Sequence, residues 1–227
     1  SKNDSQEKTW GRNKETLWET MTDIGIGISG TRKATSKNDE YYTHRYAIEP
    51  ILKYIKPNST IWCPFDTEHS NYVSELSNAG HYVKYTHIDD GKDFFETDIE
   101  CDYIISNPPY TTKNDVLTRL FELGKPFAML LNAAGLFDGQ YRFSLFKSNK
   151  FELLYMNKRV EYFTDYNDQN KSTAKSPPNP SVYFCSNMLP QQIVFEEIIK
   201  KTLWVSKTMM YVQEEEERPE WAWLTEK

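Results

Sequence analysis

The chain has 227 residues and a mass of 26.7 kDa, enough for one substantial hydrophobic core. Aromatic residues make up 15% of it, which argues against a disordered chain despite a mean hydropathy of -0.72. The longest apolar run, residues 127–137, is too short to cross a bilayer, and no signal peptide opens the sequence. Three cysteines without ligand-like spacing argue against a disulfide framework and a metal site, so we expect a cytoplasmic protein without metal.

The formal net charge is -6, from 27 Lys and Arg against 33 Asp and Glu. Much of it lies at the end of the chain, because residues 213–227 hold six Glu against only Arg218 and Lys227. The remainder of the sequence is therefore close to neutral. An acidic total does not exclude a nucleic-acid partner, provided that one face of the folded chain is basic.

Residues 1–36 are polar and are expected to form an N-terminal extension, and a first helix is predicted around residues 48–55 with Pro50 in its first turn. From residue 60 onward, short apolar runs alternate with amphipathic stretches. The predicted strands are Thr60–Cys63, Tyr82–His87, Tyr103–Ser106, Phe127–Leu131, Glu152–Met156 and Val182–Cys185, and the predicted helices are Asn71–Ala79, Thr112–Leu123 and Arg142–Lys147. This alternation predicts an α/β fold with a largely parallel sheet flanked by helices.

The segment 164–180 interrupts this alternation between two late strands. It is polar and ends in three prolines, and an irregular stretch of this length inside a domain is usually functional or disordered. The basic residues in and before it favour a loop that contacts a polyanion: Lys158, Arg159, Lys171 and Lys175. Residues 191–227 are expected to form a C-terminal extension with an acidic tail.

The strongest chemical signal is the tetrapeptide Asn107-Pro108-Pro109-Tyr110, which directly follows the predicted strand Tyr103–Ser106. Open α/β sheets bind ligands at the carboxyl ends of their strands. Two prolines fix the backbone and remove two N–H donors, so an Asn amide oxygen and a neighbouring carbonyl can both accept from a planar NH₂ group. The Tyr ring can stack on an aromatic base. The plain alternative is a strand-ending turn in which the prolines only stop the strand.

This tetrapeptide resembles the catalytic motif of S-adenosylmethionine-dependent amino-methyltransferases, above all the adenine-N6 DNA methyltransferases. Other segments resemble motifs of that family in the same order. Residues 37–43 resemble its amino-terminal cofactor motif, and Asp93-Phe94-Phe95 resembles its Asp-Phe motif. Cys63-Pro64-Phe65-Asp66, followed by Ser70-Asn71, resembles a phage- and plasmid-associated branch that includes relatives of the enzyme protecting GAATTC sites.

The resemblance implies a single Rossmann-like methyltransferase domain over residues 37–190, which transfers a methyl group from S-adenosylmethionine to the N6 amine of adenine in DNA. It assigns catalysis to Asn107, Pro108 and Tyr110, and cofactor binding to Tyr42, Thr43, Pro64, Asp66, Asp89, Asp93, Phe94 and Asn107. The target adenine would be flipped out of double-stranded DNA, in a restriction-modification or phage setting. Tyr162 and Phe163 are candidates for a second stacking wall beside the base.

Two departures from the family pattern leave alternatives open. His44 stands where many members have Pro after the Thr, and the turn after Cys63 lacks the usual glycines. The same tetrapeptide serves methyltransferases that act on RNA bases or on a glutamine side chain, and a relative without catalysis would be a binding or regulatory protein. The small surface left for reading DNA favours a short recognition site, or further contacts from a homodimer or another partner.

Overall fold

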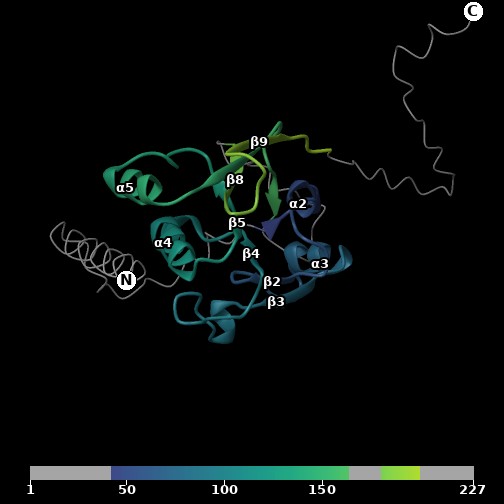
Figure 1. Ribbon diagram of the computed structural model, residues 1–227. Helices are drawn as coiled ribbons and strands as arrows, with labels where there is room; N and C mark the ends of the chain where they lie inside the picture. The colour runs from purple at the N-terminus through teal and green to yellow at the C-terminus, as the bar shows by residue number, and fades with distance from the viewer. Residues whose placement is uncertain (1–41, 164–179, 200–227) are drawn as a thin grey trace, which may run out of the picture.

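The computed structural model describes residues 42–163 and 180–199. Within these residues a seven-stranded sheet has the order β3-β2-β4-β5-β8-β6-β9, and a separate two-stranded sheet pairs β1 with β7 (Figure 1). The strands of the large sheet are β2 (Thr60–Cys63), β3 (Tyr82–Tyr85), β4 (Tyr103–Ser106), β5 (Phe127–Asn132), β6 (Glu152–Met156), β8 (Ser181–Ser186) and β9 (Ile193–Glu196). Those of the small sheet are β1 (Tyr42–Thr43) and β7 (Tyr162–Phe163).

Most neighbours in the large sheet are parallel. Strands β3, β2, β4 and β5 run in one direction, β8 pairs antiparallel with both β5 and β6, and β9 pairs parallel with β6. Strand β6 therefore runs in the same direction as β4, and only β8 is reversed. The predicted α/β fold with a largely parallel, Rossmann-like sheet is confirmed.

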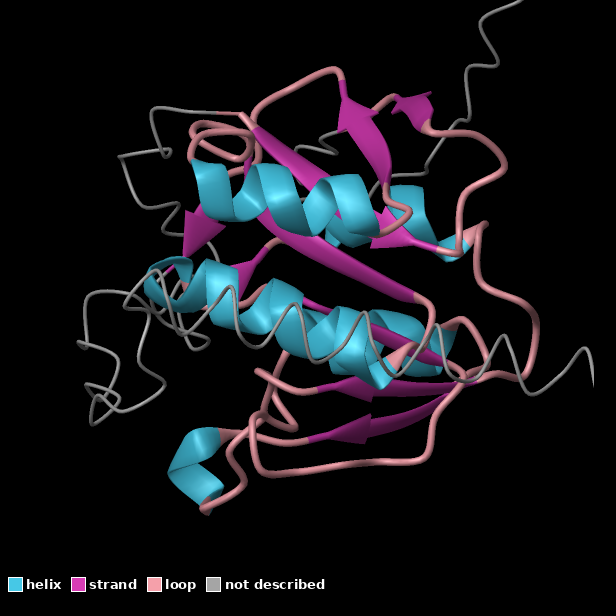
Figure 2. Cartoon of the chain, turned by 60° about the vertical axis from the view of Figure 1, so that its left-hand side comes forward, coloured by secondary structure: helices cyan, strands magenta, loops and turns pink. Residues whose placement is uncertain are grey.

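Helices cover both faces of the sheet. Figure 1 shows α2 (Arg45–Leu52) and α3 (Asn71–Asn78) on one side of the strands, with α4 (Lys113–Leu123) and α5 (Gln140–Ser148) on the other. Figure 2 turns the second pair to the front of the sheet. Because β4 is buried on both faces, Tyr103 and Ile105 join the core beneath α2 and α3, whereas Ile104 joins the core beneath α4 and α5. Such two-sided burial explains why the strands are continuous apolar runs.

Four features of the fold differ from the sequence-based expectation. Helix α2 begins at Arg45, so Pro50 lies inside the helix and not in its first turn. Strands β1 and β7 were not predicted, because a two-residue strand has no periodicity to detect. Strand β3 ends at Tyr85 and not at His87. Strand β9 continues the sheet beyond residue 190, where the domain was expected to end.

None of the helices within residues 42–163 and 180–199 is long and apolar enough to span a membrane.

Candidate active site

The point where strand order reverses lies between β2 and β4. From β2 the chain moves to β3 on one side, whereas β4 lies on the other side of β2. In open α/β sheets, the carboxyl ends of the strands at such a reversal form the usual ligand-binding place. The turn Pro64–Asn71 follows β2 there, and Asn107 follows β4. The sheet therefore brings the two most informative sequence motifs to one edge.

A hydrogen bond joins these two turns across the reversal. The hydroxyl of Ser106, the last residue of β4, donates to Asp66 Oδ2 at 2.5 Å. The hydroxyl of Ser70 donates to the other carboxylate oxygen, Oδ1. Ser70 also caps α3, because its Oγ accepts from the backbone N–H of Tyr72 at 3.1 Å. Asp66 thus fixes the end of β4 relative to the start of α3.

The Asp66 carboxyl is almost fully buried. Burial raises its pKa to about 6, although hydrogen bonds from Ser106 and Ser70 and the nearby His87 act in the opposite direction. Its backbone N–H donates to the carbonyl of Thr86 at 3.2 Å, which ties the same turn to the residue after β3. Each carboxylate oxygen accepts from one of the protein's own hydroxyls, so Asp66 links the turns after β2 and β4.

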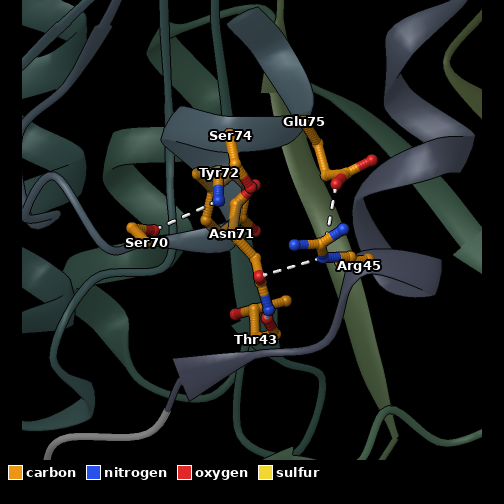
Figure 3. Close-up of polar contacts among 7 residues, drawn as sticks. All are labelled: Thr43, Arg45, Ser70, Asn71, Tyr72, Ser74 and Glu75. Carbon is orange, nitrogen blue, oxygen red and sulfur yellow. Dashed lines mark hydrogen bonds and ion pairs between the residues drawn. The ribbon is translucent and has the colours of Figure 1, made fainter. Parts of the chain in front are cut away.

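Asn71 connects this turn to β1, as Figure 3 shows. Its side chain is buried at the start of α3, and Nδ2 donates to the carbonyl oxygen of Thr43 at 2.8 Å. Arg45 Nε approaches both Asn71 Oδ1 and Glu75 Oε1 at 3.4 Å. The Asp66…Ser70-Asn71 motif, in which glycines are missing, therefore works through side-chain hydrogen bonds. A glycine-rich turn would instead present its backbone N–H groups to a ligand.

Thr43 carries a buried hydroxyl next to the turn after β2. The residue is 5% exposed, and its Oγ1 has no hydrogen-bond partner among the described residues. Strand β1 is held in place by β7, where Thr43 pairs with Tyr162 and Tyr42 pairs with Phe163. A buried hydroxyl without a partner costs about 1–3 kcal/mol, so this one fits a site that a polar group completes.

The Asn-Pro-Pro-Tyr turn leaves the sheet at its carboxyl edge. Asn107 is half-buried, Pro108 is buried, and Pro109 precedes the short 3₁₀ helix η2 (Tyr110–Thr112). Helix α4 follows at once. The side chain of Tyr110 lies outside the described residues. The motif lies where it was predicted, at the carboxyl end of a buried parallel strand.

Asp89, which the resemblance assigns to cofactor binding, lies further from its strand than expected. Asp89 belongs to the 3₁₀ helix η1 (Ile88–Asp90), which follows the end of β3, and its side chain is largely exposed. The backbone N–H of Asp89 donates to His87 Nδ1 at 3.3 Å. Since His87 also acts electrostatically on Asp66, the turn after β3 lies beside the turn after β2.

The Asp-Phe pair lies against the same strand. Phe94 is buried, with its ring centroid 5.5 Å from that of Trp62 on β2 and 5.0 Å from that of Phe65. Asp93 Oδ1 accepts from the backbone N–H of Phe95 at 2.9 Å. Phe94 is thus a core residue, and the partly exposed rings next to it are Phe65 and Phe95.

The remaining predicted residues have mixed outcomes. Lys158 and Arg159 are exposed directly after β6, which runs parallel to β4, so they lie at the same edge as Asn107. Lys171 and Lys175 lie outside the described residues.

Tyr162 and Phe163, which form β7, are completely buried. The hydroxyl of Tyr162 lies 2.8 Å from the hydroxyl of Ser181 on β8. In this structure they pack within the protein and do not form a wall for a base.

Sequence reasoning missed Ser106 as part of the site. Its signal was a single polar residue at the end of the apolar run Tyr103-Ile104-Ile105, yet nothing in the sequence identified its partner across the sheet. No group of three or more His, Cys, Asp or Glu within the described ranges is placed to hold a metal ion.

No known family model matches the sequence, and no curated protein matches it. Among solved structures, a protein described as the modification subunit of a type I restriction enzyme from Vibrio vulnificus YJ016 is similar, with 10% identity and a TM-score of 0.44 over 84% of this chain. TrmN from Thermus thermophilus is similar with 15% identity and a TM-score of 0.34 over 63% of this chain. The chain covers 51% and 47% of these two proteins, about half of each.

Proposed function

We propose that this chain transfers a methyl group from S-adenosylmethionine to the exocyclic N6 amine of adenine in DNA. One observation carries the proposal: Asn107-Pro108-Pro109-Tyr110 follows β4 directly, at the carboxyl edge of a mostly parallel sheet and beside the point where strand order reverses. The resemblance of this tetrapeptide to amino-methyltransferase motifs supplies the reaction type. The location supports a ligand-contacting turn over a plain strand terminator.

The residues around the reversal fit the cofactor that this reaction needs. The buried, unpartnered hydroxyl of Thr43 suits a charged amino acid moiety, and the exposed carboxylate of Asp89 suits ribose hydroxyls. Tyr42, Pro64, Asp93 and Phe94 lie on or beside the same elements and would complete the site. When bound, the cofactor supplies an electrophilic methyl group. Asp66 would act on the cofactor only indirectly, by fixing the turn that surrounds it.

Residues of the tetrapeptide would bind and orient the exocyclic amine of adenine, which accepts the methyl group. Its lone pair is delocalised into the adenine ring, so the amine is a poor nucleophile until it is held in the right geometry. The Asn107 amide oxygen and the Pro108 carbonyl would accept its two protons, which favours a tetrahedral nitrogen and stabilises the positive charge that develops there. Alignment for in-line transfer contributes a further part of the rate. Tyr110 would stack on the base.

A nucleic acid is preferred to a protein as the acceptor because basic residues occur at the same edge as the tetrapeptide, and the resemblance to adenine-N6 DNA methyltransferases favours DNA over RNA. Lys158 and Arg159 are exposed there, and the segment carrying Lys171 and Lys175 is attached between β7 and β8. A base inside a duplex would have to be flipped out, which costs a few kcal/mol. The described surface is modest for a sequence-specific reader, so a homodimer or a further partner would extend the contacts.

The test is methyl transfer from radiolabelled S-adenosylmethionine to unmethylated duplex DNA, with single-stranded DNA and RNA in parallel, followed by mass spectrometry of the nucleosides. N6-methyl-2′-deoxyadenosine from DNA, lost in Asn107→Ala and kept in the exposed control Asn78→Ala, is the expected result. Label in RNA alone would replace DNA by RNA as the acceptor. Cofactor binding by calorimetry without transfer to any polymer would indicate a binding or regulatory protein instead.

A further inference from the structure

Two cationic side chains that the sequence did not single out lie next to the Asn-Pro-Pro-Tyr turn. Lys113 is the first residue of α4 and follows η2 directly. Arg142 lies in the first turn of α5. Because α4 follows β4 and α5 follows β5, both helices begin at the carboxyl edge of the sheet, where Figure 2 shows them side by side in front of the strands. Lys113 and Arg142 therefore share the edge that carries Asn107.

Hydrogen bonds hold both cations in place. Lys113 Nζ donates to the carbonyl of Asn132, the last residue of β5, at 3.4 Å. Arg142 Nη1 donates to Asn114 Oδ1 at 2.7 Å, and Asn114 is the neighbour of Lys113 in α4. A contact of 2.5 Å between the hydroxyls of Tyr141 and Thr118 joins the same helices one turn further on. The two cations are thus preorganised on rigid elements.

The described residues give neither Lys113 nor Arg142 an acidic partner. Among residues 42–163 and 180–199, neither Lys113 nor Arg142 forms an ion pair. The acids nearest to them in sequence are Asp115 in the first turn of α4 and Asp138 just before α5. Arg142 Nε is buried and has no acceptor within that part of the chain. Both side chains are half-buried, and Arg142 is bonded to Asn114, the residue next to Lys113. Burial and the positive charge of Arg142 both lower the pKa of Lys113. Two adjacent, half-buried cations of this kind favour an anion between them.

We propose that Lys113 and Arg142 form a phosphate-binding site for the backbone of the acceptor strand, next to the Asn107 turn. This inference rests on the proposed function. A flipped nucleotide stays attached to its flanking phosphates, so cations beside the base-accepting motif meet the backbone of the same strand. The start of α4 adds to the attraction, because Thr112 provides no side-chain cap and the first N–H groups of the helix point toward the same edge.

The experiment measures the salt dependence of DNA binding by the full chain with S-adenosylhomocysteine present, so that no transfer occurs. The variants are Lys113→Gln, Arg142→Gln and the double variant. Each lost phosphate contact should reduce the slope of log K against log salt by about 0.9 for duplex DNA, and raise Kd about five- to tenfold near 0.1 M salt. Duplex RNA run in parallel identifies the polymer that the pair contacts.

Three controls separate loss of contact from loss of fold. Lys147→Gln removes an exposed charge from the last turn of the same α5 and should leave the slope unchanged. Lys113→Arg keeps the charge and should keep the slope. Calorimetric affinity for S-adenosylhomocysteine should be equal in all variants if the sheet edge is intact.

A double variant that loses about two units of slope while binding S-adenosylhomocysteine normally supports the inference. A wild-type chain that methylates DNA, together with a double variant of unchanged slope, overturns this inference and leaves the proposed function standing. A wild-type chain that binds neither DNA nor RNA overturns both.

Discussion

The turns after β2 and β4 meet at one edge of the sheet and are held in opposite ways. After β2, Asp66 accepts from Ser70 and Ser106, and Asn71 donates to the Thr43 carbonyl. The polar side chains of this turn therefore hydrogen-bond to other groups of the protein. After β4, Pro108 and Pro109 stiffen the backbone, and neither Pro109 nor Thr112 provides a side-chain cap. The comparison teaches that side-chain hydrogen bonds hold the first turn within the protein, whereas we propose that the second turn presents groups to a ligand. Changes in the first should alter stability, and changes in the second should alter chemistry.

The largest expected effect belongs to the turn after β4. Asn107→Ala removes the amide that we propose to contact the acceptor amine, and loss of one preorganised group of this kind costs about 10²–10³ in rate. Affinity for S-adenosylmethionine and the free energy of unfolding should change little. Steady-state methyl transfer, calorimetry and urea unfolding measure the three quantities, with Asn78→Ala as the exposed control. Near-normal turnover in Asn107→Ala would remove Asn107 from the chemistry.

The turn after β2 predicts a pH effect on stability. Burial raises the pKa of Asp66 from 3.8 to about 6, so between these values the folded chain holds more protons than the unfolded chain. Titration of Asp66 therefore adds its whole contribution to the free energy of unfolding below pH 4. This contribution, about 3 kcal/mol, is lost as the pH rises through 6. Asp66→Asn cannot titrate and lacks this dependence.

Urea unfolding of wild type and Asp66→Asn from pH 4 to pH 7 tests this prediction, because titration of all other groups cancels in the difference. The stability of wild type relative to the variant should fall across that range. Asp98→Asn changes an exposed carboxylate and serves as the control. A flat difference curve for Asp66→Asn would show that Asp66 does not titrate in this window.

A third turn, after β3, carries Asp89, which we propose to bind the cofactor. Asp89→Ala should weaken S-adenosylmethionine binding by about tenfold, the lower end of the range for a charge-assisted hydrogen bond, because the side chain is largely exposed. Turnover at saturating cofactor should fall less. Asp90→Ala in the same 3₁₀ helix is the matched control, and calorimetry is the measurement. Equal affinities in both variants would make Asp89 an ordinary surface acid.

The sequence predicted the central strands of the large sheet well because these strands are buried on both faces. Runs such as Phe127–Leu131 have no polar interruption, and amphipathic stretches between such runs are typical of helices that cover a sheet. Strands β1 and β7 could not be predicted, since two residues carry no period and their pairing joins segments far apart in the chain. The same limit hid β9, a short edge strand with alternating exposure.

The candidate site was predictable where chemistry and sequence position coincide, as in Asn107 after its strand. It was not predictable where a role depends on a contact across the fold. Asp66 was expected to bind cofactor, and only the sheet order brings its carboxylate to Ser106. Lys113 and Arg142 are unremarkable in sequence, and only the adjacent starts of α4 and α5 make them a pair.

The smallest expected effect on cofactor binding concerns the link from the turn after β2 to β1. Asn71→Ala removes the donor to the Thr43 carbonyl in a buried setting, which should lower the free energy of unfolding by about 1–3 kcal/mol. It should also weaken cofactor binding slightly, because Thr43 would lose its fixed position. Arg45→Ala removes an exposed ion pair with Glu75 from the same cluster and should cost less than about 0.5 kcal/mol. Urea unfolding and calorimetry on both variants make the comparison. If Arg45→Ala proved the more damaging change, the hydrogen bond from Asn71 would not be what holds β1 beside the turn, and this link would have to rest on the surface ion pair.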